Sequence, residues 1–231
     1  MSLSIKCYEG EVVLLDVDNE TEYQTDANVT EFKRKPVYDF IKRLLDIIFS
    51  LLALIVLSPV FLITMIAIYA EDPEPVIFKQ VRVGLNGRKF VIFKFRTMYI
   101  HAEKLKVHIM SHNNSQGANF KVKDDPRITR VGGFLRKSSI DELPQLINIL
   151  KGDMSIIGPR PFVESEQKLL PSDRLLVKPG LSCYWQIGGK NSLSLPEQIE
   201  LDRKYIRERS LLVDVKITLL TLKFIFQHLN D

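Results

Sequence analysis

Residues 47–70 read Ile-Ile-Phe-Ser-Leu-Leu-Ala-Leu-Ile-Val-Leu-Ser-Pro-Val-Phe-Leu-Ile-Thr-Met-Ile-Ala-Ile-Tyr-Ala, without one charged side chain. A continuous helix of this length would measure about 36 Å, which is enough to cross a bilayer. However, Pro59 lies at the centre of the run, where it removes a helix hydrogen bond and clashes with the preceding turn. Each half of the run is about 16 Å long, near half the hydrocarbon thickness. The segment is therefore predicted either to span with a kink or to enter, turn and leave on the same face.

The charges beside this run bear on that choice. The segment before it is basic and the segment after it is acidic: Lys33, Arg34, Lys35, Lys42 and Arg43 precede the run, and Glu71, Asp72 and Glu74 follow it. The positive-inside tendency places the basic side in the cytoplasm. A simple anchor would export everything downstream, whereas a re-entrant segment keeps both ends in the cytoplasm. A kinked spanning helix remains the alternative, because membrane helices tolerate proline.

Composition allows one domain with an appendage in these 231 residues. The net charge of +4 is unevenly distributed, since residues 1–32 carry −7 and residues 33–231 carry +11. A basic body beside an apolar run indicates an anionic surface or substrate, such as lipid headgroups, phosphates or nucleic acid. The two cysteines, Cys7 and Cys183, have no metal-ligand spacing and fit reduced thiols in a cytoplasmic setting.

The remaining chain predicts an α+β, helix-dominated fold with a small β-hairpin. Two β-rich runs, 76–83 and 88–96, flank the turn residues Asn86-Gly87. Lys94 and Arg96 lie two residues apart on one face of the second strand and are candidate phosphate-binding residues. Helices are predicted over 139–150, 196–209 and 210–229. The last carries an apolar stripe that suits either ordinary core or an interfacial amphipathic helix: Leu211, Leu212, Val215, Leu219, Leu222 and Phe226.

The densest group of charged residues lies between 125 and 161, where arginines and lysines flank the adjacent pair Asp141-Glu142. Because Pro144 is tolerated in the first turn of a helix, this pair is expected at a helix N-terminus, where backbone N–H groups attract anions. Taken alone, the pair can simply cap the helix. Yet adjacent carboxylates can hold Mg²⁺ against substrate phosphates, and a carboxylate can attack phosphorus. Beside arginines and a membrane segment, these residues suggest phosphoryl transfer onto a lipid phosphate.

The motif Gly158-Pro159-Arg160-Pro161 places one arginine between two prolines. The prolines fix the backbone, so that the guanidinium is held at low entropic cost. In isolation the motif is equally consistent with a rigid turn.

Taken together, the motifs make the chain resemble the bacterial sugar transferase family, the monotopic phosphoglycosyl transferases that act on polyprenyl phosphate. The resemblance covers residues 38–226 in order and spacing. It is carried by Lys42–Asp46, Ser58-Pro59, Val76–Gly84, Phe93–Met98, Asp125–Leu150, Lys151–Pro161, Lys178–Leu181, Trp185-Gln186 and Glu200–Ile206. So long a series of matches is specific. Residues 1–35 have no counterpart in the family's minimal catalytic unit.

The resemblance implies a re-entrant membrane helix over 36–75, bent at Ser58-Pro59, between an acidic extension at 1–35 and a cytoplasmic catalytic domain at 76–231. Asp141 would attack the β-phosphate of a UDP-sugar, release UMP and pass the sugar phosphate to polyprenyl (undecaprenyl) phosphate. Glu142 would hold Mg²⁺ together with Asp141. Further implied site residues are the phosphate-binding Arg136 and Arg160, and Asp202, an acidic position that orients an arginine.

The implied setting is the cytoplasmic face of the inner (plasma) membrane, at the first membrane step of surface glycan assembly, such as exopolysaccharide or lipopolysaccharide. The expected partners are the UDP-sugar, the polyprenyl phosphate and membrane lipids, with no nucleic acid. The transferred sugar and a homo-oligomeric state are left open. A membrane-anchored scaffold that uses the same basic surface is the competing hypothesis. It has no need for Asp141, so Asp141→Asn separates the two by abolishing transfer while membrane binding survives.

Overall fold

The computed structural model of the chain describes residues 3–8, 11–16, 32–100, 102, 125–187 and 193–228. The described helices are α1 (Pro36–Val56), α2 (Ser58–Glu71), α4 (Arg130–Ser138), α5 (Gln145–Lys151), α6 (Glu164–Gln167), α7 (Tyr184–Ile187), α8 (Leu195–Glu208) and α9 (Leu211–His228). Short 3-10 turns are η1 (Leu85–Gly87), η2 (Ile140–Glu142) and η3 (Ser172–Leu176). This helix-rich arrangement agrees with the predicted class.

The described strands form small two-stranded sheets. β1 (Leu3–Tyr8) pairs antiparallel with β2 (Glu11–Asp16), and β3 (Ile77–Val83) pairs antiparallel with β4 (Lys89–Phe95). β5 (Ser155–Ile157) pairs in parallel with β6 (Gly180–Ser182). The first hairpin lies within the predicted acidic extension, of which residues 17–31 lie outside the described part.

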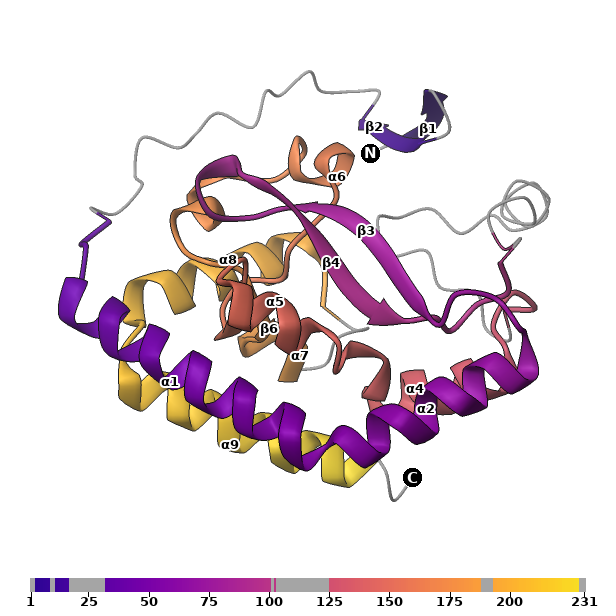
Figure 1. Cartoon of the computed structure of the whole chain (residues 1–231). Helices are drawn as coiled ribbons and strands as arrows, with labels where there is room; N and C mark the ends of the chain where they lie inside the picture. The colour runs from indigo at the N-terminus through magenta and orange to yellow at the C-terminus, as the bar shows by residue number, and fades with distance from the viewer. Residues whose placement is uncertain are drawn as a thin grey trace.

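The apolar run forms α1 and α2, which meet at an angle of 61° (Figure 1). Pro59 has no N–H to donate to the carbonyl of Ile55, and the hydroxyl of Ser58 donates to that carbonyl instead, at 2.8 Å. The predicted bend at Ser-Pro is confirmed. Among the described helices, none is by itself both long and apolar enough to cross a bilayer, and only α1 and α2 taken together meet that length and composition.

Two residues of α1 bind the backbone of the segments that follow η2. Asp46 is 4% exposed, and its carboxylate accepts a hydrogen bond from the amide of Ile156 at 3.0 Å. Arg43 donates to the carbonyls of Ile149 and Leu150 at 2.5 and 2.7 Å, where α5 ends. Arg43 therefore caps a helix C-terminus. Part of the basic flank predicted to mark the cytoplasmic side thus also holds α1 to the rest of the chain.

The start of α1 is joined to α9 through the carboxylate of Asp214. Lys42 and Tyr38 approach this carboxylate at 2.8 and 2.9 Å, and the hydroxyl of Tyr205, from α8, lies 2.9 Å from it. The Tyr205 hydroxyl is also 3.1 Å from the carbonyl of Ile157 in β5. Burial raises the pKa of Tyr205 well above its usual value, with a further contribution from Asp214. Tyr205 therefore stays neutral, and the network links α1, α8, α9 and β5.

One side of the molecule is formed by α1, α2 and α9, which lie along its lower edge in Figure 1. Large apolar side chains of all three helices remain exposed on it, including Phe40, Ile48, Leu52, Ile55, Ile63, Ile66, Leu212, Val215, Leu219 and Leu222. In α9 the opposite side chain of Ile217 is fully buried. Leu212, Val215, Leu219 and Leu222 of the predicted stripe therefore face outward rather than into the core, while the side chain of Phe226 lies outside the described part. So many exposed apolar side chains mark an interaction surface.

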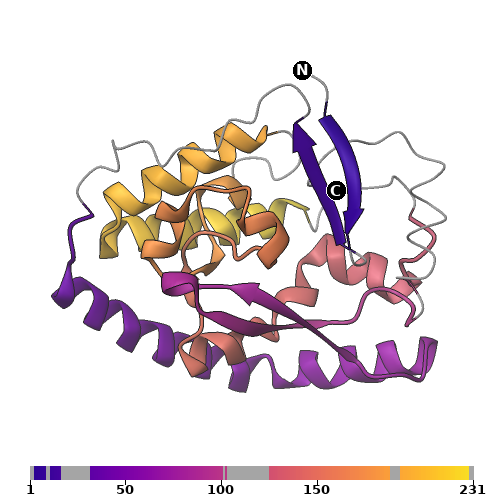
Figure 2. The ribbon, with the colours of Figure 1, turned by 90° about the horizontal axis from the view of Figure 1, so that it is seen from above.

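The predicted hairpin is confirmed by β3 and β4, drawn in magenta in Figure 2, and α5 packs against both β4 and α1. Asn86 and Gly87 adopt left-handed backbone angles, with φ of 54° and 76°, as an Asn-Gly turn requires. Phe90 and Ile92 of β4 pack with Leu146 and Ile149 of α5 and with Met154 in one core cluster. The hairpin is thereby fixed beside η2.

Candidate active site

Asp141 and Glu142 lie on the 3-10 turn η2, between α4 and α5, and not in the first turn of α5 itself. The predicted helix over 139–150 is divided into η2 and α5, and Pro144 immediately precedes α5. The helix α4 ends at Ser138, and the φ of the next residue, Ser139, is 57°, which is left-handed and uncommon for a residue with a side chain. The predicted N-terminal position therefore holds for the 3-10 turn, whereas α5 itself begins three residues after Glu142. Ser139 redirects the chain so that the carboxylates stand at the junction of α4 and α5.

Two cations from distant segments approach the carboxylate of Glu142. The Nζ of Lys94, in β4, lies 2.9 Å from Glu142 Oε1, and both side chains are 17% exposed. The Nη1 of Arg160 lies 3.5 Å from the same oxygen. Burial lowers the pKa of Lys94, while the charge of Glu142 opposes this shift. The structure thus brings together three residues predicted from the sequence as one group.

Arg136 faces the same group from α4. Its guanidinium interacts electrostatically with Asp141 and Asp125, and its Nε donates to the hydroxyl of Thr97 at 2.9 Å. The approach of α4 to Thr97 depends on Gly132, because a Cβ at that position would lie 2.1 Å from the Thr97 carbonyl oxygen. Gly132 therefore allows the contact that places Arg136 beside Asp141.

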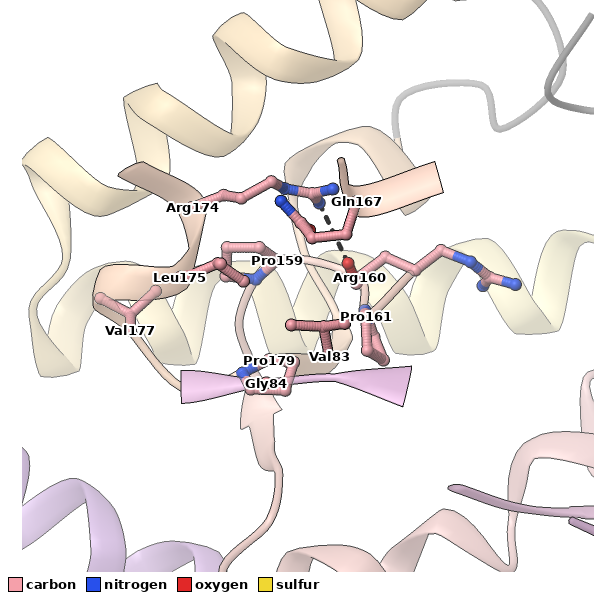
Figure 3. A pocket seen from close by; sticks show the side chains of 10 residues that line it. All are labelled: Val83, Gly84, Pro159, Arg160, Pro161, Gln167, Arg174, Leu175, Val177 and Pro179. Carbon is pink, nitrogen blue, oxygen red and sulfur yellow. Dashed lines mark hydrogen bonds between the residues drawn. The ribbon is translucent and has the colours of Figure 1, made fainter. Parts of the chain in front are cut away.

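The loop that carries Arg160 leaves the end of β5 and crosses β6 closely. A Cβ on Gly158 would lie 2.4 Å from the carbonyl oxygen of Lys178, so only glycine fits there. A small pocket adjoins this loop, and Figure 3 shows the Arg160 side chain pointing away from the pocket. The guanidinium lies 5.9 Å from the centre of the Trp185 ring, within the range of a cation–π contact. The predicted rigid turn is thus also the support of a site residue.

Asp202 lies deeper than the other predicted site residues. It is 3% exposed and pairs with Arg174, of η3, at 2.6 Å. Burial raises the pKa of Asp202 to about 6, while the charge of Arg174 opposes the shift. The predicted role of Asp202, to orient an arginine, has a partner in the structure, namely Arg174.

Arg96 is placed apart from this group. Its guanidinium pairs with the carboxylate of Asp72 and donates to the carbonyls of Asp72 and Glu74, at the end of α2. Only its neighbour on the predicted strand face, Lys94, reaches Glu142. Ser58 and Pro59 lie at the bend between α1 and α2, as their predicted role requires.

Sequence reasoning did not single out three residues around this site. Arg174 and Arg82 contact the backbone of the Arg160 loop, and Thr97 accepts the hydrogen bond from Arg136. Nothing in their spacing marks them, because each is joined to its partner only by the tertiary fold. The one available signal is Arg82, an arginine that shares a strand face with Gln80.

The donor atoms suit a magnesium ion that is shared with a substrate. Asp141 and Glu142 offer hard carboxylate oxygens, and Mg²⁺ usually binds one or two carboxylates together with phosphates and waters. Within the described residues, no group of three or more metal-ligating side chains forms a closed site. The pair therefore fits an ion whose remaining ligands come from a diphosphate.

In the described part of the chain, the cationic side chains of this site outnumber its two carboxylates. Lys94, Arg136 and Arg160 surround Asp141 and Glu142. The excess of positive charge suits a dianionic or trianionic ligand such as a diphosphate, which arginine binds in a bidentate manner. The arrangement can stabilise negative charge that develops on phosphorus-bound oxygens next to a carboxylate nucleophile.

Comparison with known proteins agrees with this geometry. The sequence profile of the family described as "Bacterial sugar transferase" matches residues 37–228. The chain is 46% identical over 190 residues to the galactosyl transferase CpsE of Streptococcus agalactiae, covering 80% of this chain and 42% of that protein. It is 40% identical over 195 residues to the exopolysaccharide production protein ExoY of Sinorhizobium fredii, covering 81% of this chain and 86% of that protein.

A third relative is the UDP-glucose:undecaprenyl-phosphate glucose-1-phosphate transferase of Escherichia coli, which is 37% identical over 205 residues, or 80% of this chain. The chain spans less than half the length of the Streptococcus and Escherichia relatives and most of the Sinorhizobium protein. The family profile covers nearly the whole chain outside the acidic extension. This chain belongs to the bacterial sugar transferase family.

Proposed function

We propose that the chain transfers a sugar-1-phosphate from a UDP-sugar to undecaprenyl phosphate and releases UMP. The observation that carries the proposal is the meeting of Lys94 and Arg160 on Glu142, directly beside Asp141. The names of the relatives support the two substrates, since one is a UDP-glucose:undecaprenyl-phosphate glucose-1-phosphate transferase and another an undecaprenyl-phosphate galactose phosphotransferase.

In the first proposed step, a carboxylate oxygen of Asp141 attacks the β-phosphorus of the UDP-sugar. The bond from this phosphorus to the bridging oxygen breaks, and UMP leaves with the electron pair. A sugar phosphate then remains bonded to Asp141 as an acyl phosphate. Arg136 and Arg160 bind the diphosphate oxygens and stabilise the charge that develops on them.

In the second step, an oxygen of undecaprenyl phosphate attacks the same phosphorus. The bond to the Asp141 oxygen breaks, the carboxylate is regenerated, and the sugar is released on a lipid diphosphate. Two displacements at one carboxylate let a small site serve two large substrates in turn. Mg²⁺, held by Asp141 and Glu142, would supply charge neutralisation for both phosphates.

Glu142 has a role that its contacts define. Its carboxylate is fixed by Lys94 and Arg160, so it holds the Arg160 guanidinium close to Asp141 before a ligand binds. Removing it would take away the negative charge that offsets the repulsion between Lys94 and Arg160. We therefore assign Glu142 to the organisation of the phosphate site and Asp141 to the attack.

The membrane arrangement forms part of the proposal. A lipid phosphate stays at headgroup depth, so the nucleophile must lie at that depth too. The outward apolar face of α1, α2 and α9 suits insertion into one leaflet, and the 61° bend suits exit on the side of entry. We propose that the site faces the cytoplasm, where UDP-sugars are made.

The test is UMP release by the purified protein with Mg²⁺, undecaprenyl phosphate and a panel of UDP-sugars. Release with one donor, lost in Asp141→Asn, is the expected result. Glu164→Gln is the matched carboxylate control, because Glu164 pairs with Lys89 on the exposed surface and should retain full activity.

The covalent step has a test of its own. With a donor that is radiolabelled in the sugar and no acceptor, label should remain on the denatured wild-type protein and be absent from Asp141→Asn. If UMP release requires the acceptor and no label is ever retained, transfer is direct and the aspartyl intermediate is wrong. UMP release that survives in Asp141→Asn would contradict the assignment of the nucleophile.

A further inference from the structure

Two arginines from distant segments hold the two successive carbonyls of the Arg160 loop. The Nη2 of Arg174, in η3, lies 3.0 Å from the carbonyl oxygen of Arg160, as Figure 3 shows. The Nη1 of Arg82, in β3, lies 3.4 Å from the carbonyl oxygen of Pro161. Because the flanking prolines already restrict the backbone, these contacts fix where the Arg160 side chain begins.

One nitrogen of Arg174 serves two acceptors. Its Nη2 donates to the Arg160 carbonyl at 3.0 Å and to the carboxylate of Asp202 at 2.6 Å. This nitrogen carries two hydrogens, which can point one to each acceptor. The Arg174 and Asp202 side chains are only 5% and 4% exposed, and the ring of Phe162 lies 4.4 Å from the guanidinium. The position of the guanidinium is therefore fixed from three sides.

We propose that Arg174 and Asp202 are positioning residues that set the place of Arg160 for the bound diphosphate. The effect of this pair on catalysis rests on the proposed function. Its effect on the position of Arg160 does not, because that position is set in the protein without substrate. Neither Arg174 nor Asp202 touches substrate in this scheme. Both act through the carbonyl of Arg160, whose guanidinium reaches Glu142.

The structure contains a matched control for this pair. Arg203 and Asp173 are the sequence neighbours of Asp202 and Arg174, and they form a second ion pair of 2.7 Å between the same two elements, α8 and η3. Within the described residues, this second pair makes no hydrogen bond or ion pair with Arg160 or its neighbours, although the charge of Asp173 also acts on Arg174 and Asp202. Arg203→Gln should therefore loosen the contact between α8 and η3, retain the charge of Asp173 and leave the loop in place.

The first experiment uses the fluorescence of Trp185, the single tryptophan of the chain. Because the Arg160 guanidinium lies 5.9 Å from its ring, the emission reports the position of Arg160 without any substrate. The variants Arg174→Gln and Asp202→Asn of the full chain should shift the emission and raise acrylamide quenching toward the values of Arg160→Ala. Arg203→Gln should retain the wild-type spectrum. Wild-type emission in both Arg174→Gln and Asp202→Asn would overturn the proposal.

The second experiment is a double-mutant cycle on UMP release. Arg174→Gln should reduce kcat/KM for the donor by about 10- to 100-fold, since a small misplacement of a binding group can cost that much. In the Arg160→Ala background the same change should cost only a few-fold, and KM for the acceptor should not change. Equal losses in both backgrounds would show a merely structural role and contradict the proposal.

The two experiments also separate this inference from the proposed function. If the wild-type protein releases no UMP from any donor, the proposed function fails, and the fluorescence comparison still decides whether Arg174 places Arg160. Asp202→Asn, which keeps the size of the side chain, replaces Arg174→Gln in the cycle if the latter does not fold. Arg203→Gln accompanies both as the folding control.

Discussion

Replacing Gly132 by alanine tests the contact on which the position of α4 depends. An added Cβ would lie 2.1 Å from the carbonyl oxygen of Thr97 and 2.7 Å from its carbonyl carbon and Cα. All three atoms belong to the backbone, so no side chain can rotate away. The next residue, Gly133, supplies the control, because a Cβ there meets nothing within 4 Å.

The two substitutions are expected to change the free energy of unfolding in opposite directions. Ordinary contact with a Cβ begins at 3.4 Å, so Gly132→Ala requires α4 and the Thr97 backbone to separate by about 1.3 Å. Overpacking of this kind costs about 3 kcal/mol of unfolding free energy when backbone must move. Gly133→Ala should instead stabilise the protein by ~0.5–1 kcal/mol, because alanine loses less backbone entropy in a helix.

The assay is thermal unfolding of the full chain in one detergent, together with UMP release. For a chain of this size about 4 kcal/mol separates the two variants by roughly 10 °C in Tm. Gly132→Ala should also lose activity, because Arg136 donates to Thr97 across the disturbed contact. If Gly132→Ala melts within about 2 °C of Gly133→Ala, the close approach of α4 to Thr97 is refuted.

Three further outcomes are expected. Glu71→Ala should lower the free energy of unfolding by about 1 kcal/mol in thermal unfolding, since the Glu71 carboxylate accepts hydrogen bonds from the first two amides of α4 at 2.7 and 2.9 Å. Glu74→Ala, at an exposed position, should have no measurable effect. Pro59→Ala should move the far end of 47–70 to the opposite face of the membrane in part of the molecules, as measured by labelling cysteines introduced at both ends of the segment. Unchanged same-side labelling would show that the bend does not depend on Pro59. Finally, turnover should fall as the pH drops through about 6, because Asp202 then takes up a proton and its pairing with Arg174 weakens. This fall on the acid side of the pH profile should be missing from the residual activity of Asp202→Asn. If the fall is unaltered in that variant, it belongs to another group.

Local patterns predicted most of the elements. The Asn86-Gly87 turn and its flanking strands, the bend beside Pro59 and the two C-terminal helices follow from backbone preferences that act within a few residues. The division of 139–150 does not follow in the same way. Ser139 takes a left-handed φ that a serine side chain does not favour, while α4 on one side of it packs on Phe95 and α5 on the other side packs on Phe90 and Ile92.

The site was predictable to the extent that its members are charged and close in sequence. Asp141, Glu142 and Arg136 lie within one motif, and Arg160 is marked by its prolines. Arg174 could not be found, because its function depends on a carbonyl that lies 14 residues away in sequence and is reached only in the fold. Arg96 shows the converse, since it shares the strand face of Lys94 but is bound by the end of α2.

The contacts of α1 explain why an apolar helix and a charged site occur in one small chain. Asp46 binds the amide of Ile156, and Arg43 binds the last carbonyls of α5. Ile156 lies four residues before Arg160, and α5 begins three residues after Glu142. The same helix that presents apolar side chains outward therefore holds both supports of the site at a constant distance from that face. If α1 inserts as proposed, the depth of its insertion sets the height of Asp141 above the bilayer, and no separate hinge is needed to bring the nucleophile to a lipid phosphate.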